Sequence, residues 1–317
     1  MTSIPRPAAA LLAAALLLGA CGQARDGEGP AGDATPAVAA DPAFEAGEAG
    51  WREERRERLL EEDGWASLVG LHWLELRAHY IGSSPTSGIR LAMGPPKLGL
   101  VQQDSERVTF TPEPGVEATL GDAPVAGRVV LLEGRGAEAA ELRFDEGRGR
   151  LTVIERGGRR ALRVKHADAP ARVRFGEIPY WPADPGWSVE ARFVPHPAGR
   201  TLEIASIIGG TEPVPNPGAL EFTRDGGSYR LEALEGEDGG FFVIFADRTS
   251  GHDSYGAGRY LDTAAPDAQG RVTLNFNRAY NPPCAFTDFA TCPLPPPENR
   301  LDLAVTAGEQ AYPRPGT

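Results

Sequence analysis

The sequence is poor in cysteine, with three residues in 317, and this scarcity limits what sulfur chemistry can contribute. Cys21 follows an N-terminal apolar run, so only Cys284 and Cys292 remain for the rest of the chain. Zinc knuckles use closer C-x-x-C spacings with further ligands nearby, so we predict no metal site here. We predict a disulfide between Cys284 and Cys292, as is usual in an oxidising compartment, with two free thiols as the main alternative.

Positive charge is scarce relative to negative charge. The formal net charge is −12 at pH 7. Binding of nucleic acid and electrostatic docking on anionic lipid both depend on an excess of lysine and arginine. We therefore expect no nucleic-acid partner.

Long apolar runs are absent apart from Ala8 to Leu18, which follows the positively charged Arg6. This run is too short to span a bilayer as a helix and is typical of a signal peptide. The next residues, Leu18-Gly19-Ala20-Cys21, resemble a bacterial lipobox, in which the cysteine is lipidated. We predict a lipoprotein signal at residues 1–21 and an extracytoplasmic protein held by Cys21 on the cell membrane or the outer membrane. A cleaved secretory signal with a chance cysteine is the alternative.

The remaining chain divides by composition into a tether and a folded part. Residues 22–43 are rich in Gly, Ala, Pro and Asp, so they bury too little surface to offset the entropy of ordering and should form a flexible tether. The rest is long enough for one large core or two smaller ones. We expect a helix plus a β-sandwich-like half at 44–177 and a second β-rich half at 178–317.

The fold class is predicted to be mainly β. One convincing helix spans 45–62, with Asp63-Gly64 as its glycine C-cap. Short strand-like runs separated by turn residues recur along the rest of the chain, which is typical of sandwiches and barrels. The runs lie at 88–93, 107–112, 116–120, 127–134, 140–144, 150–158, 161–166, 171–176, 201–208, 218–223, 229–234, 241–246 and 272–276. We predict two packed β-rich halves and one N-terminal helix.

A long proline-rich loop follows the last predicted strand. Prolines at 282, 283, 293 and 295–297 exclude a central strand there. Long loops without regular structure are uncommon in compact domains, and they are usually disordered or functional. The aromatic residues and cysteines of this loop argue against disorder, so we predict an ordered loop over a site.

Several segments are similar to a family that has no assigned activity. They are GWASLVGLHWLE, PYWPADPGWSVEARFVPHP, FADRTSGHDSYGAGRYLD, LNFNRAYNPPCAF and TCPLPPPENRL. The chain resembles domain of unknown function 1684, a bacterial and archaeal family, from about residue 50 to 310. The resemblance implies a β-rich fold and imports no reaction.

The polar residues near these segments are the candidate ligand-binding residues. They are His72, Asp247, Thr249, Tyr255, Arg259, Asn275, Asn277, Arg278, Tyr280, Glu298 and Asn299. Two amides on one sheet face beside an arginine and tyrosines could bind a carboxylate, sugar or phosphate. Alternatively, Asn275 and Asn277 hydrogen-bond the backbone of the proline loop. A structural role is the alternative for His72.

The leading functional hypothesis is an envelope lipoprotein that binds a small polar ligand between loops 247–260 and 278–300. A hydrolase that uses the same loops, with Glu298 or His252 as base, is the second hypothesis, and a structural envelope module is the third. The sequence has no nucleophile elbow and no glycine-rich loop that opens a helix to bind phosphate. We predict no cofactor.

Overall fold

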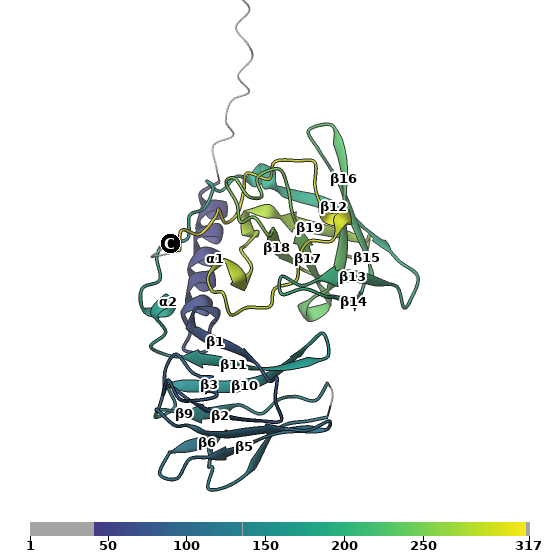
Figure 1. Ribbon diagram of the computed structural model, residues 1–317. Coiled ribbons are helices and arrows are strands. Elements are labelled where there is room, and N and C mark those ends of the chain that lie inside the picture. The colour runs from purple at the N-terminus through teal and green to yellow at the C-terminus, as the bar shows by residue number, and fades with distance from the viewer. Residues whose placement is uncertain (1–40, 135, 315–317) are drawn as a thin grey trace, which may run out of the picture. The chain divides into compact units, whose positions relative to one another are not determined.

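The computed structural model describes residues 41–134 and 136–314. The predicted signal peptide, Cys21 and most of the predicted tether lie outside these residues. The described chain begins with the long helix α1 (Pro42–Leu60), which starts inside the predicted tether and ends before residue 62 (Figure 1). No helix in the described ranges has both the length and the apolar character needed to cross a membrane.

Local chemistry explains both ends of α1. The Asp41 carboxylate accepts a hydrogen bond from the backbone N–H of Ala43, and Pro42 occupies the first turn, where a missing N–H costs nothing. The chain leaves the helix in extended conformation, so Gly64 is not the left-handed cap that we predicted. A side chain at Gly64 would place its Cβ 2.5 Å from the carbonyl oxygen of Leu59. Close backbone approach therefore requires this glycine.

The first β-rich half is a two-sheet sandwich. One sheet has the order β1 (Leu68–Trp73), β11 (Arg159–His166), β10 (Gly149–Arg156), β9 (Leu142–Phe144), β6 (Ala118–Leu120) and β7 (Ala123–Pro124). The other has the order β3 (Ile89–Arg90), β2 (Ala78–Gly82), β4 (Gly99–Gln103), β5 (Arg107–Pro112) and β8 (Val129–Glu133). Their inner faces bury Phe110, Leu142, Phe144 and Leu151 in one core. Gly157 and Gly158 both have positive φ, which fits the predicted β10–β11 hairpin turn.

The predicted strand at 171–176 is wrong. Residues 170–173 form the short helix α2 (Pro170–Val173) instead. Proline at its first position is preset for a helical turn and cannot donate to a sheet ladder.

The second β-rich half is a nearly closed barrel. Its strand order is β18 (Arg259–Thr263), β17 (Phe241–Phe245), β16 (Gly227–Glu235), β15 (Gly218–Arg224), β12 (Ser188–Pro195) and β19 (Arg271–Asn275), and β18 packs near β19. The buried side chains of Leu231, Phe245, Leu261 and Phe276 belong to its core. The hairpin of β13 (Thr201–Ala205) and β14 (Thr211–Pro215) forms a separate small sheet.

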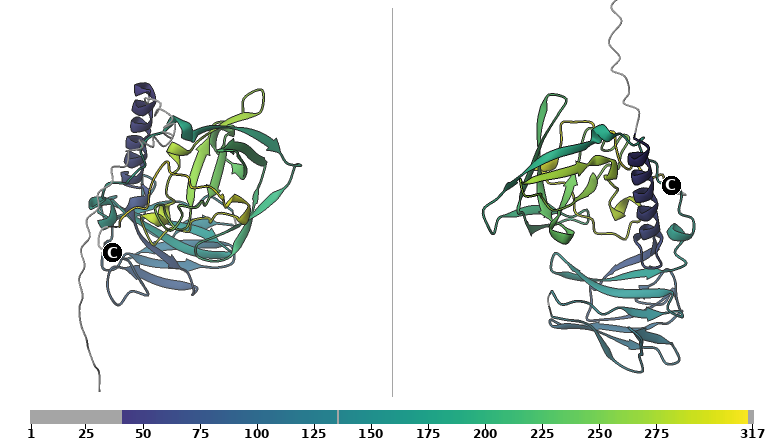
Figure 2. Two further views of the ribbon diagram at one scale, coloured as in Figure 1. Left: turned by 90° about the horizontal axis from the view of Figure 1, so that it is seen from above. Right: turned by 180° about the vertical axis from the view of Figure 1, so that it is seen from behind.

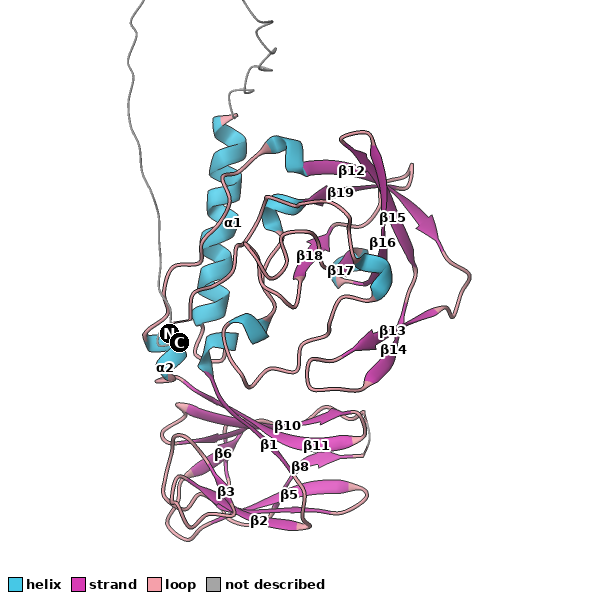
Figure 3. Ribbon diagram, turned by 45° about the horizontal axis from the view of Figure 1, so that its top comes forward, coloured by secondary structure: helices cyan, strands magenta, loops and turns pink. Residues whose placement is uncertain are grey.

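Short 3-10 turns punctuate the loops. They are η1 (Trp65–Ser67), η2 (Pro185–Trp187), η3 (Glu237–Gly239), η4 (Phe276–Arg278), η5 (Pro283–Ala285) and η6 (Pro297–Asn299). Helix α1 runs beside the barrel in every view (Figures 2 and 3). The mainly β fold with one long N-terminal helix is as predicted.

Candidate functional site

Arg259 and Asp247, both predicted ligand-binding residues, form a closed ion pair inside the protein. The Arg259 Nη2 lies 2.6 Å from Asp247 Oδ2, and neither side chain is exposed to solvent. The guanidinium also donates to the carbonyl oxygens of Val305, Ala307 and Glu309. Burial lowers the pKa of Arg259, and the charge of Asp247 opposes that shift. This pair fastens the C-terminal segment to the barrel and leaves both charges unavailable to a ligand.

Thr249 extends the same network. Its backbone N–H donates to Asp247 Oδ1 at 2.6 Å, and its hydroxyl contacts the hydroxyl of Ser254 at 2.8 Å. These bonds fold residues 247–254 into a tight turn whose buried side chains are Asp247, Thr249 and Ser254. Thr249 therefore supports the ion pair.

Asn275 ends β19 and Asn277 lies in the 3-10 turn η4, so the two amides do not share a sheet face as predicted; they hold α1 and a distant loop. Asn275 donates to Glu48 Oε1 at 2.9 Å, and Arg278 Nε donates to the same oxygen at 3.1 Å. Asn277 binds both backbone groups of Asp184, each at 2.9 Å. The amides thus bind protein, as in the alternative that we considered, although their partners are Glu48 and Asp184 rather than the proline loop.

Asn299 and Glu298, two further predicted ligand-binding residues, differ in burial. Asn299 is buried and bonds the backbone N–H and C=O of Glu232 and the C=O of Ile244. Glu298 is exposed. His252, the other residue that we considered as a base, is exposed as well.

The cysteines are close together but unbonded, which corrects the predicted disulfide. Cys284 and Cys292 are both free and buried, and the Cys284 N–H donates to the Cys292 Sγ at 3.0 Å. The contact between the thiols lowers the pKa of Cys284 and raises that of Cys292. The hydroxyl of Tyr255, a predicted ligand-binding residue, donates to the Cys284 carbonyl at 3.0 Å and so joins the two loops. Within the described ranges, no three potential metal ligands cluster.

His72 lies away from these loops, on β1 of the sandwich. Its ring packs over Gly70, where an added Cβ would lie 2.5 Å from His72 Nε2. Burial lowers the pKa of His72, and Nε2 has no hydrogen-bond partner among the described residues. The ring packs against its own strand.

Tyr280 is the predicted residue that does line a cavity. Its backbone exchanges two hydrogen bonds with Tyr260, so the two predicted loops meet at this point. Its hydroxyl donates to Asp262 at 2.8 Å, and the guanidinium carbon of Arg55 lies 4.6 Å from its ring centroid. Tyr280 thus joins α1 to β18 at the base of the cavity.

We call this space the helix cavity. It measures about 1060 Å³ and lies between α1 and the outer face of β17 and β18. Aromatic side chains form much of its wall, and carboxylates surround it. Its lining includes Trp51, Arg55, Arg58, Glu61, Asp63, Trp65, Glu235, Glu237, Phe242, Tyr260, Asp262, Tyr280 and Pro283.

The charge of the helix cavity is mainly negative. Arg55 is committed to Glu309 at 3.1 Å and to the Asn281 carbonyl at 3.0 Å, and Arg58 lies 3.9 Å from Glu54. Among the cavity's acidic residues, Asp63 lies 3.7 Å from Arg150. The other four acidic residues are Glu61, Glu235, Glu237 and Asp262. Among residues 41–134 and 136–314, no arginine or lysine lies within ion-pair distance of them.

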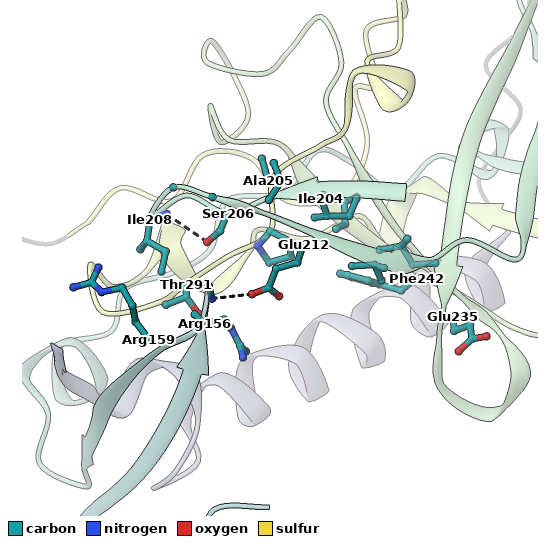
Figure 4. A pocket seen from close by; sticks show the side chains of 18 of the residues that line it. Arg156, Arg159, Ile204, Ala205, Ser206, Ile208, Glu212, Glu235, Phe242 and Thr291 are labelled. Atoms are coloured by element: carbon teal, nitrogen blue, oxygen red, sulfur yellow. Dashed lines mark hydrogen bonds between the residues drawn. The ribbon is translucent and has the colours of Figure 1, made fainter. Parts of the chain in front are cut away.

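A second space, which we call the hairpin cavity, adjoins the first at Glu235 and Phe242. It measures about 670 Å³ and lies under the β13–β14 hairpin (Figure 4). Thr291 and Pro293 of the proline loop form part of its wall. The proline-rich loop therefore covers a cavity, although a different one from the pocket predicted between the two loops.

Comparison with known proteins identifies the family. Residues 173–310 match the family described as Protein of unknown function (DUF1684). A solution NMR structure of an uncharacterized protein from gene locus rrnAC0354 of Haloarcula marismortui is 37% identical, over 44% of this chain and 78% of that chain, with a TM-score of 0.36. The chain belongs to the DUF1684 family. No curated protein matches it. The family match begins at residue 173, so the near full-length resemblance is not confirmed.

In this DUF1684 protein, only weak sequence patterns mark the residues of the helix cavity that were not predicted. Trp51 and Arg55 are four residues apart on one face of the helix, a spacing that is also typical of ordinary packing surface. Asp262 ends the motif GRYLD, where alternation along β18 places it opposite the buried Leu261. Only the pairing of β18 with β17 and the position of α1 bring these residues together.

Proposed function

We propose that this protein binds a small polar ligand carrying a cationic amine in the helix cavity. The observation that supports this most is the combination of an aromatic wall with four carboxylates that have no ion-pair partner in the described part of the chain. Ammonium groups are recognised in just such surroundings, since carboxylates supply charge and aromatic faces attract cations.

Trp51 is the aromatic side chain best suited to receive the ligand's cation. The ring of Tyr280 already carries Arg55, and that of Trp65 lies within 5.8 Å of Lys165 and 5.3 Å of Arg163. In the described part of the chain, no cation lies over Trp51. A ligand cation beside Trp51 would be on the same side of α1 as Arg55, one helical turn away.

Choline and its neutral isostere 3,3-dimethylbutan-1-ol provide a matched pair of probes, because they share a shape and differ in charge. Calorimetric titration of the purified full chain should show choline binding at one site and much weaker binding of the alcohol. Equal binding of the two probes, or no binding of choline, would contradict the proposal.

The variant Asp262→Asn should weaken choline binding about fivefold, because a partly exposed ion pair is worth about 1 kcal/mol. Trp51→Leu should weaken it by a similar factor through loss of the cation–π contact, worth about 0.5–1 kcal/mol at an exposed site. Neither change should alter binding of the neutral isostere. The exposed Glu203→Gln, which does not line the cavity, is the control and should leave both titrations unchanged.

The pH dependence of choline binding should report Asp262. Burial raises the pKa of Asp262, while the hydrogen bond from Tyr280 opposes the shift. A raised pKa means that the carboxylate takes up its proton at higher pH than an ordinary aspartate, and choline keeps its charge throughout. Affinity should therefore fall as pH decreases, starting above the range in which exposed aspartates titrate, near 4. Calorimetry across this range should show the step in the native chain and lose it in Asp262→Asn; a step that survives the substitution excludes Asp262 as its source.

We also propose that the protein is an envelope lipoprotein anchored through Cys21. The lipobox-like sequence Leu18-Gly19-Ala20-Cys21 supports this proposal. Mass spectrometry of the protein expressed in a bacterial host should find an acylated N-terminal peptide that Cys21→Ala abolishes. An unmodified Cys21 in the membrane fraction would exclude the anchor.

A further inference from the structure

The hairpin cavity has an apolar interior built from three parts of the barrel half. Ile204 and Val214 come from the β13–β14 hairpin, Leu234 comes from β16, and Phe242 and Ile244 come from β17. These side chains form one hydrophobic cluster on the outer face of the barrel. A volume of about 670 Å³ lies within the range of small-molecule sites, and its mainly apolar walls favour an aliphatic or aromatic ligand.

The sandwich half contributes two arginines to the cavity, Arg156 at the end of β10 and Arg159 at the start of β11. Arg159 is neutralised, since its Nη2 lies 2.6 Å from Glu75 and its guanidinium stacks 4.3 Å from the centroid of Trp73. Arg156 donates to the carbonyl of Glu155 at 2.8 Å, and no carboxylate of the described residues lies within ion-pair distance of it. Arg156 is thus an exposed cation without an ion-pair partner among the described residues.

Charged side chains line the cavity on both sides of its apolar interior. In Figure 4, Arg156 and Arg159 lie at one end and Glu235 lies at the other. Glu212, near the arginines, accepts a hydrogen bond from the backbone N–H of Gly157 at 3.0 Å, which ties the hairpin to the sandwich turn. This end therefore carries the Arg156 guanidinium and the Glu212 carboxylate, which are not within ion-pair distance of each other, next to an apolar interior.

We propose that the hairpin cavity binds a medium-chain aliphatic carboxylate, with its chain against Leu234, Phe242 and Ile244 and its carboxylate on Arg156. Charge complementarity favours an anionic group, because Arg156 has no ion-pair partner in the part of the chain that the structure describes, and a guanidinium binds carboxylates with two parallel hydrogen bonds. This site is separate from the amine site of the helix cavity and does not depend on it.

Octanoate and 1-octanol, used below micelle-forming concentrations, are matched probes of equal chain length. Calorimetry on the purified full chain should show that both bind once, with octanoate about tenfold tighter and with the negative heat-capacity change of apolar burial. Arg156→Ala should remove the preference for octanoate and leave 1-octanol binding unchanged. Arg174→Ala, an exposed arginine outside the cavity lining, is the control and should change neither titration.

A second variant blocks the cavity from outside the core. Thr211 lines the cavity but is exposed on β14, so Thr211→Trp should fold and should abolish binding of both octanoate and 1-octanol. Choline binding should persist in the Arg156 and Thr211 variants, which separates this proposal from the previous one. Octanoate binding that is indifferent to both variants would overturn the assignment.

A second copy of the chain is the competing occupant, because Ile207 and Ile208 at the hairpin turn are each 41% exposed. Sedimentation of the full chain should give a monomer whose mass octanoate does not change. A dimer that Thr211→Trp dissociates, with no octanoate binding, would show that this surface is a protein interface and would overturn the ligand proposal.

Discussion

Replacing Arg259 with methionine should lower the free energy of unfolding by about 3–5 kcal/mol, the usual cost of breaking a buried ion pair by removing one partner. The substitution leaves the Asp247 carboxylate buried without a counter-charge. It also removes the donors that bind the carbonyl oxygens of Val305, Ala307 and Glu309. Urea unfolding followed by circular dichroism measures the loss directly.

The neighbouring arginine provides a matched control. Arg248 lies 2.6 Å from Asp302, the same distance that separates Arg259 from Asp247. Both side chains of the Arg248–Asp302 pair, however, are mostly exposed. Arg248→Met should therefore cost less than about 1 kcal/mol. Comparable losses for the two variants would contradict a structural role for the Arg259–Asp247 pair.

Replacing Glu309 with alanine should also cost about 3–5 kcal/mol. Its fully buried carboxylate accepts hydrogen bonds from Arg55 at 3.1 Å, the Tyr180 hydroxyl at 3.2 Å and the Asn281 N–H at 2.7 Å. Its removal leaves the charge of Arg55 uncompensated at 8% exposure. Urea unfolding of the variant gives the magnitude.

Glu309 also fixes part of the wall of the helix cavity, because it holds the Arg55 guanidinium against the ring of Tyr280. Glu309→Gln keeps an acceptor for the Asn281 N–H and should cost less stability than the alanine variant. Glu54→Ala, at an exposed contact of 3.9 Å with Arg58, should cost no more than about 0.5 kcal/mol. A loss in Glu309→Ala as small as that in Glu54→Ala would show that α1 is not held by this carboxylate.

Hydrophobic alternation predicted most of the fold. The strands at 107–112, 241–246 and 272–276 were visible because apolar residues repeat there or run continuously between turn residues. The segment 171–176 has the same alternation, yet Pro170 sets a helical turn. The sequence of this segment alone does not show whether the hydrophobic alternation or the proline determines its structure.

The candidate site was harder to predict because the partner of a polar side chain is set by the tertiary fold. Asn275 bonds Glu48, 227 residues away in sequence, and Arg259 bonds Val305, 46 residues away. The sequence showed which polar groups are concentrated in two loops, but it could not show that other protein groups already occupy them. Likewise, the spacing of Cys284 and Cys292 indicated proximity without establishing a bond.

The polar residues that hold the fold are distinct from those that face the helix cavity, and two carboxylates test this distinction most directly. Asp262 lines the helix cavity, whereas Glu298 belongs to the loop first predicted to bind the ligand and does not line it. Choline titration of Asp262→Asn and Glu298→Gln by calorimetry should show about fivefold weaker binding in the first and native affinity in the second. Weakened binding in Glu298→Gln with native affinity in Asp262→Asn would contradict the account.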